Sequence, residues 1–140
     1  MVAEQYMLQT CNPSDNRTFP GSTLPDCSTL ASGIHACQAK GKIVTISLGG
    51  ATGVIGFTND TQASKFADQI WNIFLGSFVL LCVYSMLSES ELIIGGSSDT
   101  RPFGNAVLDG IDLDVEGGSK TGYTAFVNQI RSHANGAGKR

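Results

Sequence analysis

The sequence predicts an α/β fold with parallel strands, and two observations support this prediction. Residues 42–48 and 106–116 each have the hydrophobic pattern of a strand, and each is followed by a glycine loop and a helical pattern. Residues 42–48 are also β-branched and nearly continuous in hydrophobicity, which is typical of a strand buried on both faces. Two successive units of this kind indicate a parallel sheet, which is either an open doubly wound sheet or part of a barrel.

A short amphipathic helix is expected before the first strand, over residues 26–38. Asp26 or Ser28 is available as its N-cap, and Gly41 follows its end. Its apolar face would hold three residues at helical spacing, namely Leu30, Ile34 and Cys37.

Each strand is expected to lead into a further amphipathic helix. After the first strand, Gly49 and Gly50 form the loop, and Asn59 or Asp60 caps the helix. After the second strand, the loop at residues 117–119 leads into the last helix. The expected apolar faces comprise Phe66, Ile70, Ile73 and Phe74 in the first of these helices, and Tyr123, Phe126, Val127 and Ile130 in the last.

The charge pattern argues against nucleic-acid and membrane partners. Charged residues make up 15% of the chain, with nine basic and twelve acidic side chains and no run of like charge. The apolar run at residues 73–87 is shorter than a membrane span requires. The first residues carry Glu4 where a secretory signal would be basic, so we expect no export signal in this chain.

The cysteines favour a disulfide over a metal site. Cys11, Cys27, Cys37 and Cys82 lack the Cys-x-x-Cys spacing of a zinc cluster, so we expect no metal and no other cofactor. The first three lie close together in a turn-rich stretch, where a disulfide is easily formed and useful in an oxidising compartment. This indicates a secreted protein, although Cys37 and Cys82 can equally be unpaired packing residues.

The second strand carries an unusual set of acids, which we call the acidic row (Asp112, Asp114 and Glu116). Because side chains alternate along a strand, these acids would share one face, about 6 to 7 Å apart, at the carboxyl end where α/β proteins place active sites. The aliphatic residues Ile111, Leu113 and Val115 would occupy the other face.

Four interpretations of the acidic row are open. A metal site needs three converging oxygens, whereas successive residues on one face of a strand diverge. An Asp-x-Asp motif of a glycosyltransferase lacks a preceding nucleotide-binding glycine pattern. A merely solvated strand face fits poorly, because Asp is a weak strand former. General acid catalysis by Glu116, with a neighbouring Asp that holds it, fits the spacing best.

Three other residues are expected to be structural. His35 and His133 lack a Ser or Cys partner motif, so each is interpreted as a surface or helix-end histidine. Trp71 lies one step off the apolar stripe in mid-helix, so packing is favoured over a role as a sugar-stacking platform.

At this point the residues carry a resemblance to a known family. The segment Asp-Gly-Ile-Asp-Leu-Asp-Val-Glu at 109–116 resembles the Asp-Gly-x-Asp-x-Asp-x-Glu signature of family 18 glycoside hydrolases, and Ser-Leu-Gly-Gly at 47–50 resembles the Ser-x-Gly-Gly strand of the same family. The surrounding sequence is similar to fungal and plant class III chitinases, over nearly all of the chain outside residues 77–95. The resemblance implies a (β/α)8 barrel, with the two strands corresponding to barrel strands three and four.

The resemblance also implies roles for individual residues. Glu116 would protonate the glycosidic oxygen of chitin, Asp114 would orient the substrate acetamido group, and Asp112 would tune the charge behind it. The acetamido oxygen would be the nucleophile, which is the substrate-assisted exception to the scheme with two carboxylates. Ser47, Gly49 and Gly50 would line the barrel floor and bind the substrate. Other implications are a Cys11–Cys27 disulfide, an extracellular enzyme and a monomer at full length.

Two departures from the family pattern stand out. The chain, residues 1–140, would be a partial catalytic domain, because the Tyr and Trp of the family's later strands have no counterpart in it. Residues 77–95 form a hydrophobic insertion, and their removal restores a family-like Leu-Gly-Gly-Ser-Ser linkage. We interpret this insertion as a retained intron translated in frame. The chain alone is therefore expected to be inactive, and a sugar-binding or inhibitory protein on the same scaffold is the alternative function.

Overall fold

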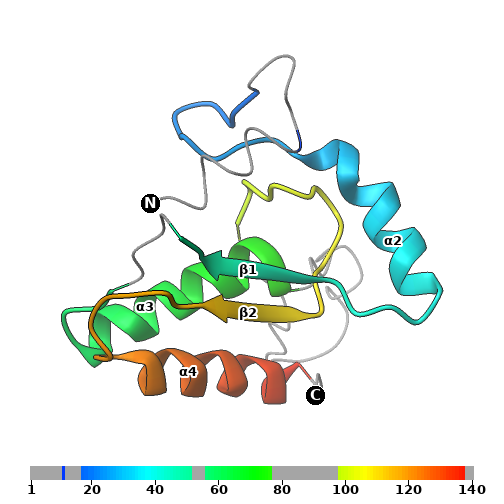
Figure 1. Cartoon of the computed structure of the whole chain (residues 1–140). Helices are drawn as coiled ribbons and strands as arrows, with labels where there is room; N and C mark the ends of the chain where they lie inside the picture. The colour runs from blue at the N-terminus through cyan, green and yellow to red at the C-terminus, as the bar shows by residue number, and fades with distance from the viewer. Residues whose placement is uncertain (1–10, 12–16, 52–55, 77–97, 138–140) are drawn as a thin grey trace, which may run out of the picture.

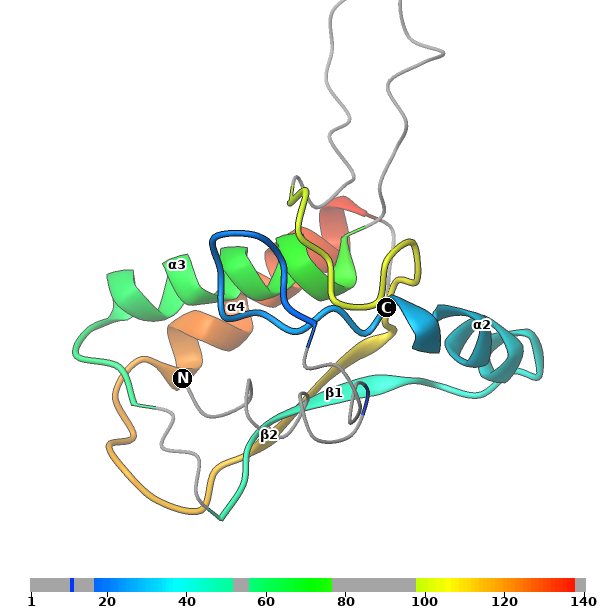
Figure 2. The ribbon, with the colours of Figure 1, turned by 90° about the horizontal axis from the view of Figure 1, so that it is seen from above.

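The computed structural model describes residue 11 and residues 17–51, 56–76 and 98–137. The sequence of elements is a 3₁₀ turn (Ser28–Leu30), α2 (Ala31–Ala39), β1 (Thr45–Gly49), α3 (Asp60–Ile70), a π-helical turn (Trp71–Leu75), β2 (Gly110–Asp114) and α4 (Tyr123–Gly136). The two strands lie side by side and point the same way (Figure 1), and α3 and α4 lie on one side of them (Figure 2). The view from above shows α3 and α4 running next to each other, with α2 beyond the end where β1 begins (Figure 2). Residues 77–95 and Cys82 lie outside the described residues.

The two strands form a parallel ladder, as the sequence predicts. Ile46 pairs with Ile111 and Leu48 with Leu113, so that aliphatic residues from both strands face the same helices. Ile46 and Leu48 are buried, and Ile111 and Leu113 pack against the same core. Because side chains alternate, this register leaves the polar residues of both strands on the opposite face.

The prediction that the first strand is buried on both faces is wrong. The strand begins at Thr45 instead of residue 42, and its exposed and buried residues alternate. Ile43, which the sequence placed inside the strand, is 80% exposed. The reason is that α3 and α4 cover one face of the sheet, while no described helix covers the other (Figure 2).

The helix before β1 is also less amphipathic than the sequence predicts. It starts as a 3₁₀ turn and becomes α-helical at Ala31. Of the three residues expected on its apolar face, only Ile34 is buried, whereas Leu30 is 41% exposed and Cys37 is an exposed free thiol. This helix therefore contributes one buried apolar residue to the core, and its other contacts with the rest of the chain include polar ones, from His35 to Asn105 and from Gln38 to Val107 and Asp109.

The start of α3 is built as predicted. Asn59 is the N-cap, and its side-chain oxygen accepts a hydrogen bond from the backbone N–H of Gln62 at 2.9 Å. The Gln62 side chain in turn accepts a hydrogen bond from the backbone N–H of Thr58 at 2.7 Å. These reciprocal bonds satisfy N–H groups that a helix start leaves unpaired.

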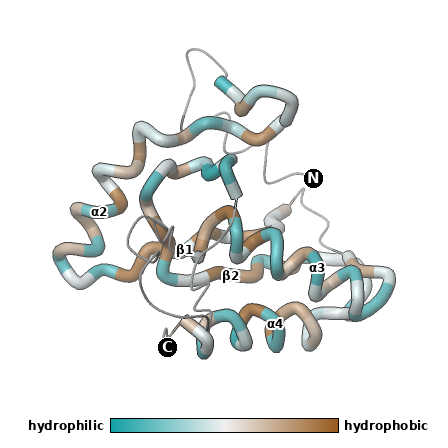
Figure 3. Tube along the Cα trace, turned by 180° about the vertical axis from the view of Figure 1, so that it is seen from behind, coloured by the Kyte–Doolittle hydropathy of each residue, from teal (hydrophilic) through white to brown (hydrophobic). Residues whose placement is uncertain are grey.

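The core lies between the sheet and the two long helices. Hydrophobic and hydrophilic residues alternate along α3 and α4, as amphipathic helices require (Figure 3). Gly122, just before α4, has a φ of 81°, and a Cβ atom there would lie 2.9 Å from the Cβ atoms of Phe57 and Ala63. The buried core comprises Ile34, Ile46, Leu48, Phe57, Ala63, Ala67, Ile70, Trp71, Phe74, Leu75, Ala106, Leu108 and Phe126. Trp71 is 5% exposed, in agreement with its packing interpretation.

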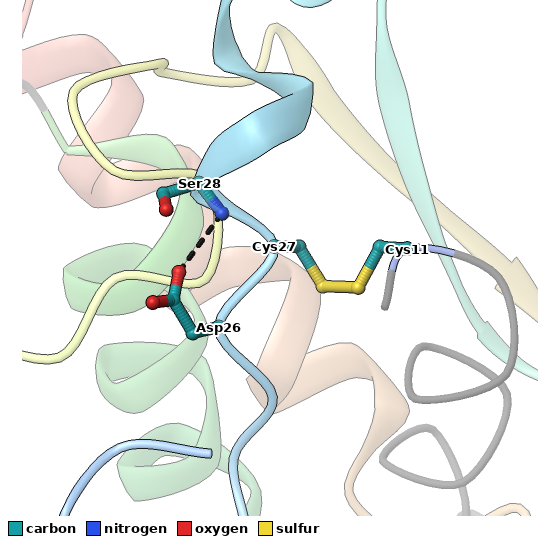
Figure 4. Close-up of a disulfide and its surroundings, with 4 residues drawn as sticks. All are labelled: Cys11, Asp26, Cys27 and Ser28. Atoms are coloured by element: carbon teal, nitrogen blue, oxygen red, sulfur yellow. Dashed lines mark hydrogen bonds between the residues drawn. A yellow bond between two sulfur atoms is a disulfide. The ribbon is translucent and has the colours of Figure 1, made fainter. Parts of the chain in front are cut away.

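A disulfide joins Cys11 to Cys27, as the family resemblance implies (Figure 4). Cys27 is fully buried, and its backbone N–H donates to the carbonyl of Pro102 at 2.8 Å. Beside it, Asp26 accepts a hydrogen bond from the backbone N–H of Ser28 at 3.0 Å (Figure 4). Hydrogen bonds from the hydroxyl and the backbone of Ser28 lower the pKa of Asp26. In the described part of the chain, no helix is both long and apolar enough to cross a membrane.

Candidate active site

The face of the sheet that points away from α3 and α4 carries two members of the acidic row. Asp112 and Asp114 are exposed on β2, whereas their neighbours Ile111 and Leu113 are half-buried against the core. The alternation predicted from the sequence therefore holds within the strand. Two carboxylates are thus displayed on an open polar surface near the carboxyl end of a parallel sheet.

Ser47 lies beside Asp112 because the two residues are register partners across the ladder. Its hydroxyl donates a hydrogen bond to the Asp112 carboxylate through Oδ2. A hydrogen bond to an ionised acceptor is stronger than one between neutral groups, so this contact fixes the direction of the carboxylate. The structure therefore brings together two residues that are 65 positions apart and that the sequence assigned separately.

Two glycines at the end of β1, Gly49 within the strand and Gly50 directly after it, lie beside Asp114. Gly49 and Gly50 have φ values of 117° and 87°, which are left-handed conformations that favour glycine. The backbone N–H of Gly50 donates to the carbonyl of Asp114 at 2.8 Å. A Cβ atom at Gly50 would lie 3.8 Å from Asp114 Oδ2, which is an ordinary contact distance, so the restriction to glycine here comes from the backbone conformation.

Glu116 does not lie within the strand, which corrects the prediction for residues 106–116. The strand spans Gly110–Asp114, and Glu116 follows it in an exposed segment before Gly117. Val115, expected on the buried face, is 43% exposed. Residues 106–109 lack a strand partner in regular register, so the second strand starts late as well. Glu116 is exposed, and among the described residues no hydrogen bond or ion pair joins it to Asp112 or Asp114.

Two residues that the sequence analysis left without a role hold the opposite end of the sheet. Asp109 Oδ2 accepts hydrogen bonds from the backbone N–H of Val44 at 2.8 Å and from Gln38 Nε2 at 3.1 Å. The sequence carries a signal for Asp109, since it is the first acid of the segment 109–116. Gln38 carries no such signal, because its partners lie about 70 positions away.

The chemistry available to this site is that of carboxylates. Among the described residues, no group of three or more His, Cys, Asp or Glu side chains is arranged to hold a metal ion. The site offers the Glu116 side chain beyond the end of β2, the Asp114 side chain beside Gly50, and the Asp112 side chain, which accepts a hydrogen bond from a hydroxyl. This combination suits general acid catalysis at the carboxyl end of β2.

Comparison with known proteins identifies the family of this chain from its sequence and finds similar solved structures. Residues 9–140 match the family described as Glycosyl hydrolases family 18. Over 113 residues, or 81% of this chain, the sequence is 50% identical to Chitinase 2 of Rhizopus oligosporus, and the matched region is 17% of that protein. The chain therefore spans about a sixth of this curated relative.

Two solved structures are similar to the described fold. The chitinase ICChI from Ipomoea carnea has a TM-score of 0.65 and 33% sequence identity, over 81% of this chain and 35% of that chain. The xylanase and α-amylase inhibitor protein XAIP-II from Scadoxus multiflorus has a TM-score of 0.59 and 28% identity, over 92% of this chain and 47% of that chain. The two strand–helix units are thus part of a (β/α)8 barrel, as predicted. The chain belongs to family 18 of the glycosyl hydrolases.

Proposed function

We propose that this protein is a chitinase-type glycoside hydrolase that cleaves β-1,4 bonds between N-acetylglucosamine units with retention. One observation carries the proposal, namely the segment 109–116, which places Asp112, Asp114 and Glu116 at the carboxyl end of a parallel strand. The relatives that are named chitinases support the same reaction and the same polymer.

Glu116 is the general acid in this proposal. Its proton passes to the glycosidic oxygen as the bond between that oxygen and the anomeric carbon breaks. The carbonyl oxygen of the substrate's own acetamido group attacks the anomeric carbon, so no second carboxylate is needed as a nucleophile. Water then attacks the same carbon, the bond to the acetamido oxygen breaks, and the proton that water loses returns to Glu116. The exposure of Glu116 beyond β2 supports this role, because a proton donor for a polymer must be reached from solvent.

Asp114 and Asp112 act behind Glu116. Asp114 orients the acetamido group, and the space that Gly50 leaves beside its carboxylate supports this assignment. Asp112 adjusts the charge of the site, and the hydrogen bond from Ser47 holds it in a defined orientation. Ser47, Gly49 and Gly50 form the floor under the sugar, where their small side chains leave room for the ring.

The chain is proposed to need further barrel strands before it can hydrolyse chitin. Parallel sheets are normally covered on both faces. The test is a chimera in which this chain, without residues 77–95, replaces the matched 113 residues of the Rhizopus oligosporus Chitinase 2. Its hydrolysis of a fluorogenic chitooligosaccharide is measured beside the 140-residue chain and beside Glu116→Gln variants of both.

We expect activity in the chimera and none in the 140-residue chain. Glu116→Gln should reduce kcat of the chimera by 10²-fold or more, because the amide cannot donate the proton and general acid catalysis is worth about 10² to 10⁴-fold. A folded chimera that is inert, or one whose Glu116→Gln variant keeps its rate, would contradict the proposal.

A sugar-binding or inhibitory protein is the second candidate, and the likeness to the inhibitor XAIP-II favours it. The presence of Glu116 argues for turnover, because loss of the proton donor is the simplest route to an inert barrel. If the protein is instead a sugar-binding or inhibitory protein, the chimera will bind chitooligosaccharide in calorimetry without hydrolysing it, and Glu116→Gln will leave the binding unchanged.

The protein is further proposed to act outside the cell, as a monomer. The Cys11–Cys27 disulfide supports this location, because disulfides persist in oxidising compartments. A non-reducing gel of protein recovered from the culture medium and from the cell interior tests the location. Disulfide-bonded protein in the interior alone would contradict it.

A further inference from the structure

We propose that Gln38 and Asp109 form a positioning joint that sets the register of β1 against β2, and thereby brings Ser47 to Asp112. The catalytic consequence of this joint rests on the proposed function, whereas its effect on the register does not. Neither residue touches the open polar face, so both act on the site through the backbone.

Val44 is the residue before β1, and both its backbone N–H and its backbone carbonyl are hydrogen-bonded to Asp109. The backbone N–H of Asp109 donates to the Val44 carbonyl at 2.8 Å, and Asp109 Oδ2 accepts from the Val44 N–H at 2.8 Å. The carboxylate thus takes the place of a backbone carbonyl and extends the ladder by one residue. The first regular pair, Thr45 and Gly110, follows directly.

Gln38 ties the end of α2 to the same point. Its Nε2 atom donates to the Val107 carbonyl at 2.7 Å and to Asp109 Oδ2 at 3.1 Å. An amide nitrogen has two hydrogens, so both are used on the segment that enters β2. Since five residues separate α2 from β1, this contact fixes where β1 starts relative to β2.

The register matters because strand side chains alternate with a period of two. A slip of one residue would place Ile111 or Leu113 opposite Ser47, and would turn Asp112 toward the core. The ladder has five pairs, and its other end carries two glycines, which add no side-chain packing. The buried aliphatic pairs of the ladder oppose such a slip along one face, and the joint adds polar side-chain contacts against it at the end where the strands begin.

Hydrogen exchange of the 140-residue chain tests the register. We compare the Gly50 amide, which bonds to Asp114 across the sheet, with the Phe126 amide, which bonds to Gly122 inside the start of α4. In Asp109→Ala and in Gln38→Leu, exchange at Gly50 should speed up by about tenfold while exchange at Phe126 keeps its rate, because a lost hydrogen bond to a charged group is a large local effect. Asp109→Asn keeps an acceptor oxygen and should restore part of the protection.

Asp99→Asn is the matched control, since Asp99 is an exposed carboxylate outside the joint. If Asp109→Ala does not fold, Gln38→Leu and Asp109→Asn decide the question, because both keep the Val44 contact to residue 109. Equal acceleration at Gly50 and Phe126 would show a general loss of stability and overturn the proposal. Unchanged exchange at Gly50 would overturn it as well.

The chimera tests the catalytic consequence. Gln38→Leu should lower kcat by about tenfold and change KM by less than twofold, because misplacement of about 1 Å can cost up to 10²-fold in rate. An unchanged kcat would overturn this part of the proposal. If the unsubstituted chimera is inert, the proposed function fails, and the exchange experiment still decides whether the joint sets the register.

Discussion

The imidazole ring of His133 lies flat against the indole ring of Trp71, with centroids 5.2 Å apart and planes inclined by 18°. Trp71 belongs to the π-helical turn after α3, and His133 to the last turn of α4. On α3, Asp68 Oδ1 accepts hydrogen bonds from His133 Nε2 and from Gln129 Nε2, each at 2.7 Å. The sequence predicted a helix-end histidine, and the structure adds that this histidine joins the two long helices.

The Asp68 carboxylate makes this contact depend on pH. Burial opposes its ionisation, but hydrogen bonds from His133 and Gln129 outweigh burial and leave the pKa of Asp68 below its ordinary value of 3.8. A carboxyl with a lowered pKa stabilises the fold above the unfolded pKa, and this stability is lost as pH falls through the folded pKa. We therefore expect Asp68→Asn to lower the free energy of unfolding at pH 7 and to have a smaller effect at pH 3.

Urea unfolding of both proteins at the two pH values measures this difference. The effect at pH 7 should be modest, because the Asp68 side chain is 43% exposed and solvent screens its contacts. Asp99→Asn, at an exposed carboxylate, is the control. If the difference in the free energy of unfolding between Asp68→Asn and the parent is the same at pH 3 as at pH 7, the lowered pKa of Asp68 is contradicted.

Gly122 should resist substitution more than other glycines with positive φ. Its φ of 81° and the 2.9 Å approach to Phe57 and Ala63 make a Cβ atom both strained and overpacked. We expect Gly122→Ala to lower the free energy of unfolding by about 2–5 kcal/mol, from about 1–2 for the left-handed backbone and about 1–3 for overpacking.

Gly41→Ala is the matched control for this substitution. Gly41 has a φ of 71°, but no atom lies within 4 Å of a Cβ placed there. Gly41→Ala should lower the free energy of unfolding only by the cost of the left-handed backbone, about 1–2 kcal/mol. Equal losses at the two sites in chemical denaturation would show that the close approach of α3 to Gly122 has no energetic weight.

Ser47→Ala should slow the chimera without unfolding it. The substitution removes the hydrogen bond to Asp112, and Ser47 is exposed, so packing is little affected. A hydrogen bond to a charged group is worth about 1.5–3 kcal/mol, so a loss of tenfold or more in kcat is expected. Ser132→Ala, on the exposed face of α4, should keep the parent rate. An unchanged kcat in Ser47→Ala would remove Asp112 from the proposed mechanism.

Deletion of residues 77–95 should leave the fold intact. The described residues on either side are joined without them, because Arg101 Nη1 donates to the Asn72 carbonyl at 3.0 Å and the rings of Phe74 and Phe103 lie 5.9 Å apart. A shorter connection costs less conformational entropy to close when the chain folds, so we expect the free energy of unfolding to rise by about 1 kcal/mol.

Denaturant unfolding of the deletion variant measures this change, and the transcript tests its origin. A deletion variant that is less stable than the parent would show that residues 77–95 belong to the fold. A mature message that contains the 19 codons would contradict the proposed retained intron.

Local patterns in the sequence predicted the elements that depend on local contacts. The helix cap at Asn59 and the alternation at Asp112 and Asp114 follow from short spacings, and both are found in the structure. The exposure of Ile43 could not be predicted, because it depends on which elements cover the second face of the sheet. The prediction that the strand extends to Glu116 was wrong for a related reason, since an apolar and acidic alternation continues past the last residue that has a ladder partner.

The candidate site shows the same division. The acids themselves were visible in the sequence, whereas the pairing of Ser47 with Asp112 needs the register of two strands 65 residues apart. The contacts of Gln38 and His133 likewise join residues more than 60 positions apart. Side chains of this kind look ordinary in the sequence because their partners are chosen by the fold.

The exposed thiol of Cys37 has a practical consequence for anyone who handles this protein. A thiolate can attack a disulfide of another molecule and form a mixed disulfide, and the Cys11–Cys27 bond is a target for such exchange. A covalent dimer on a non-reducing gel would then report sulfur chemistry during purification, and would say nothing of how the molecule assembles. Alkylation of Cys37, or its replacement by Ser, separates the two before any oligomeric state is assigned.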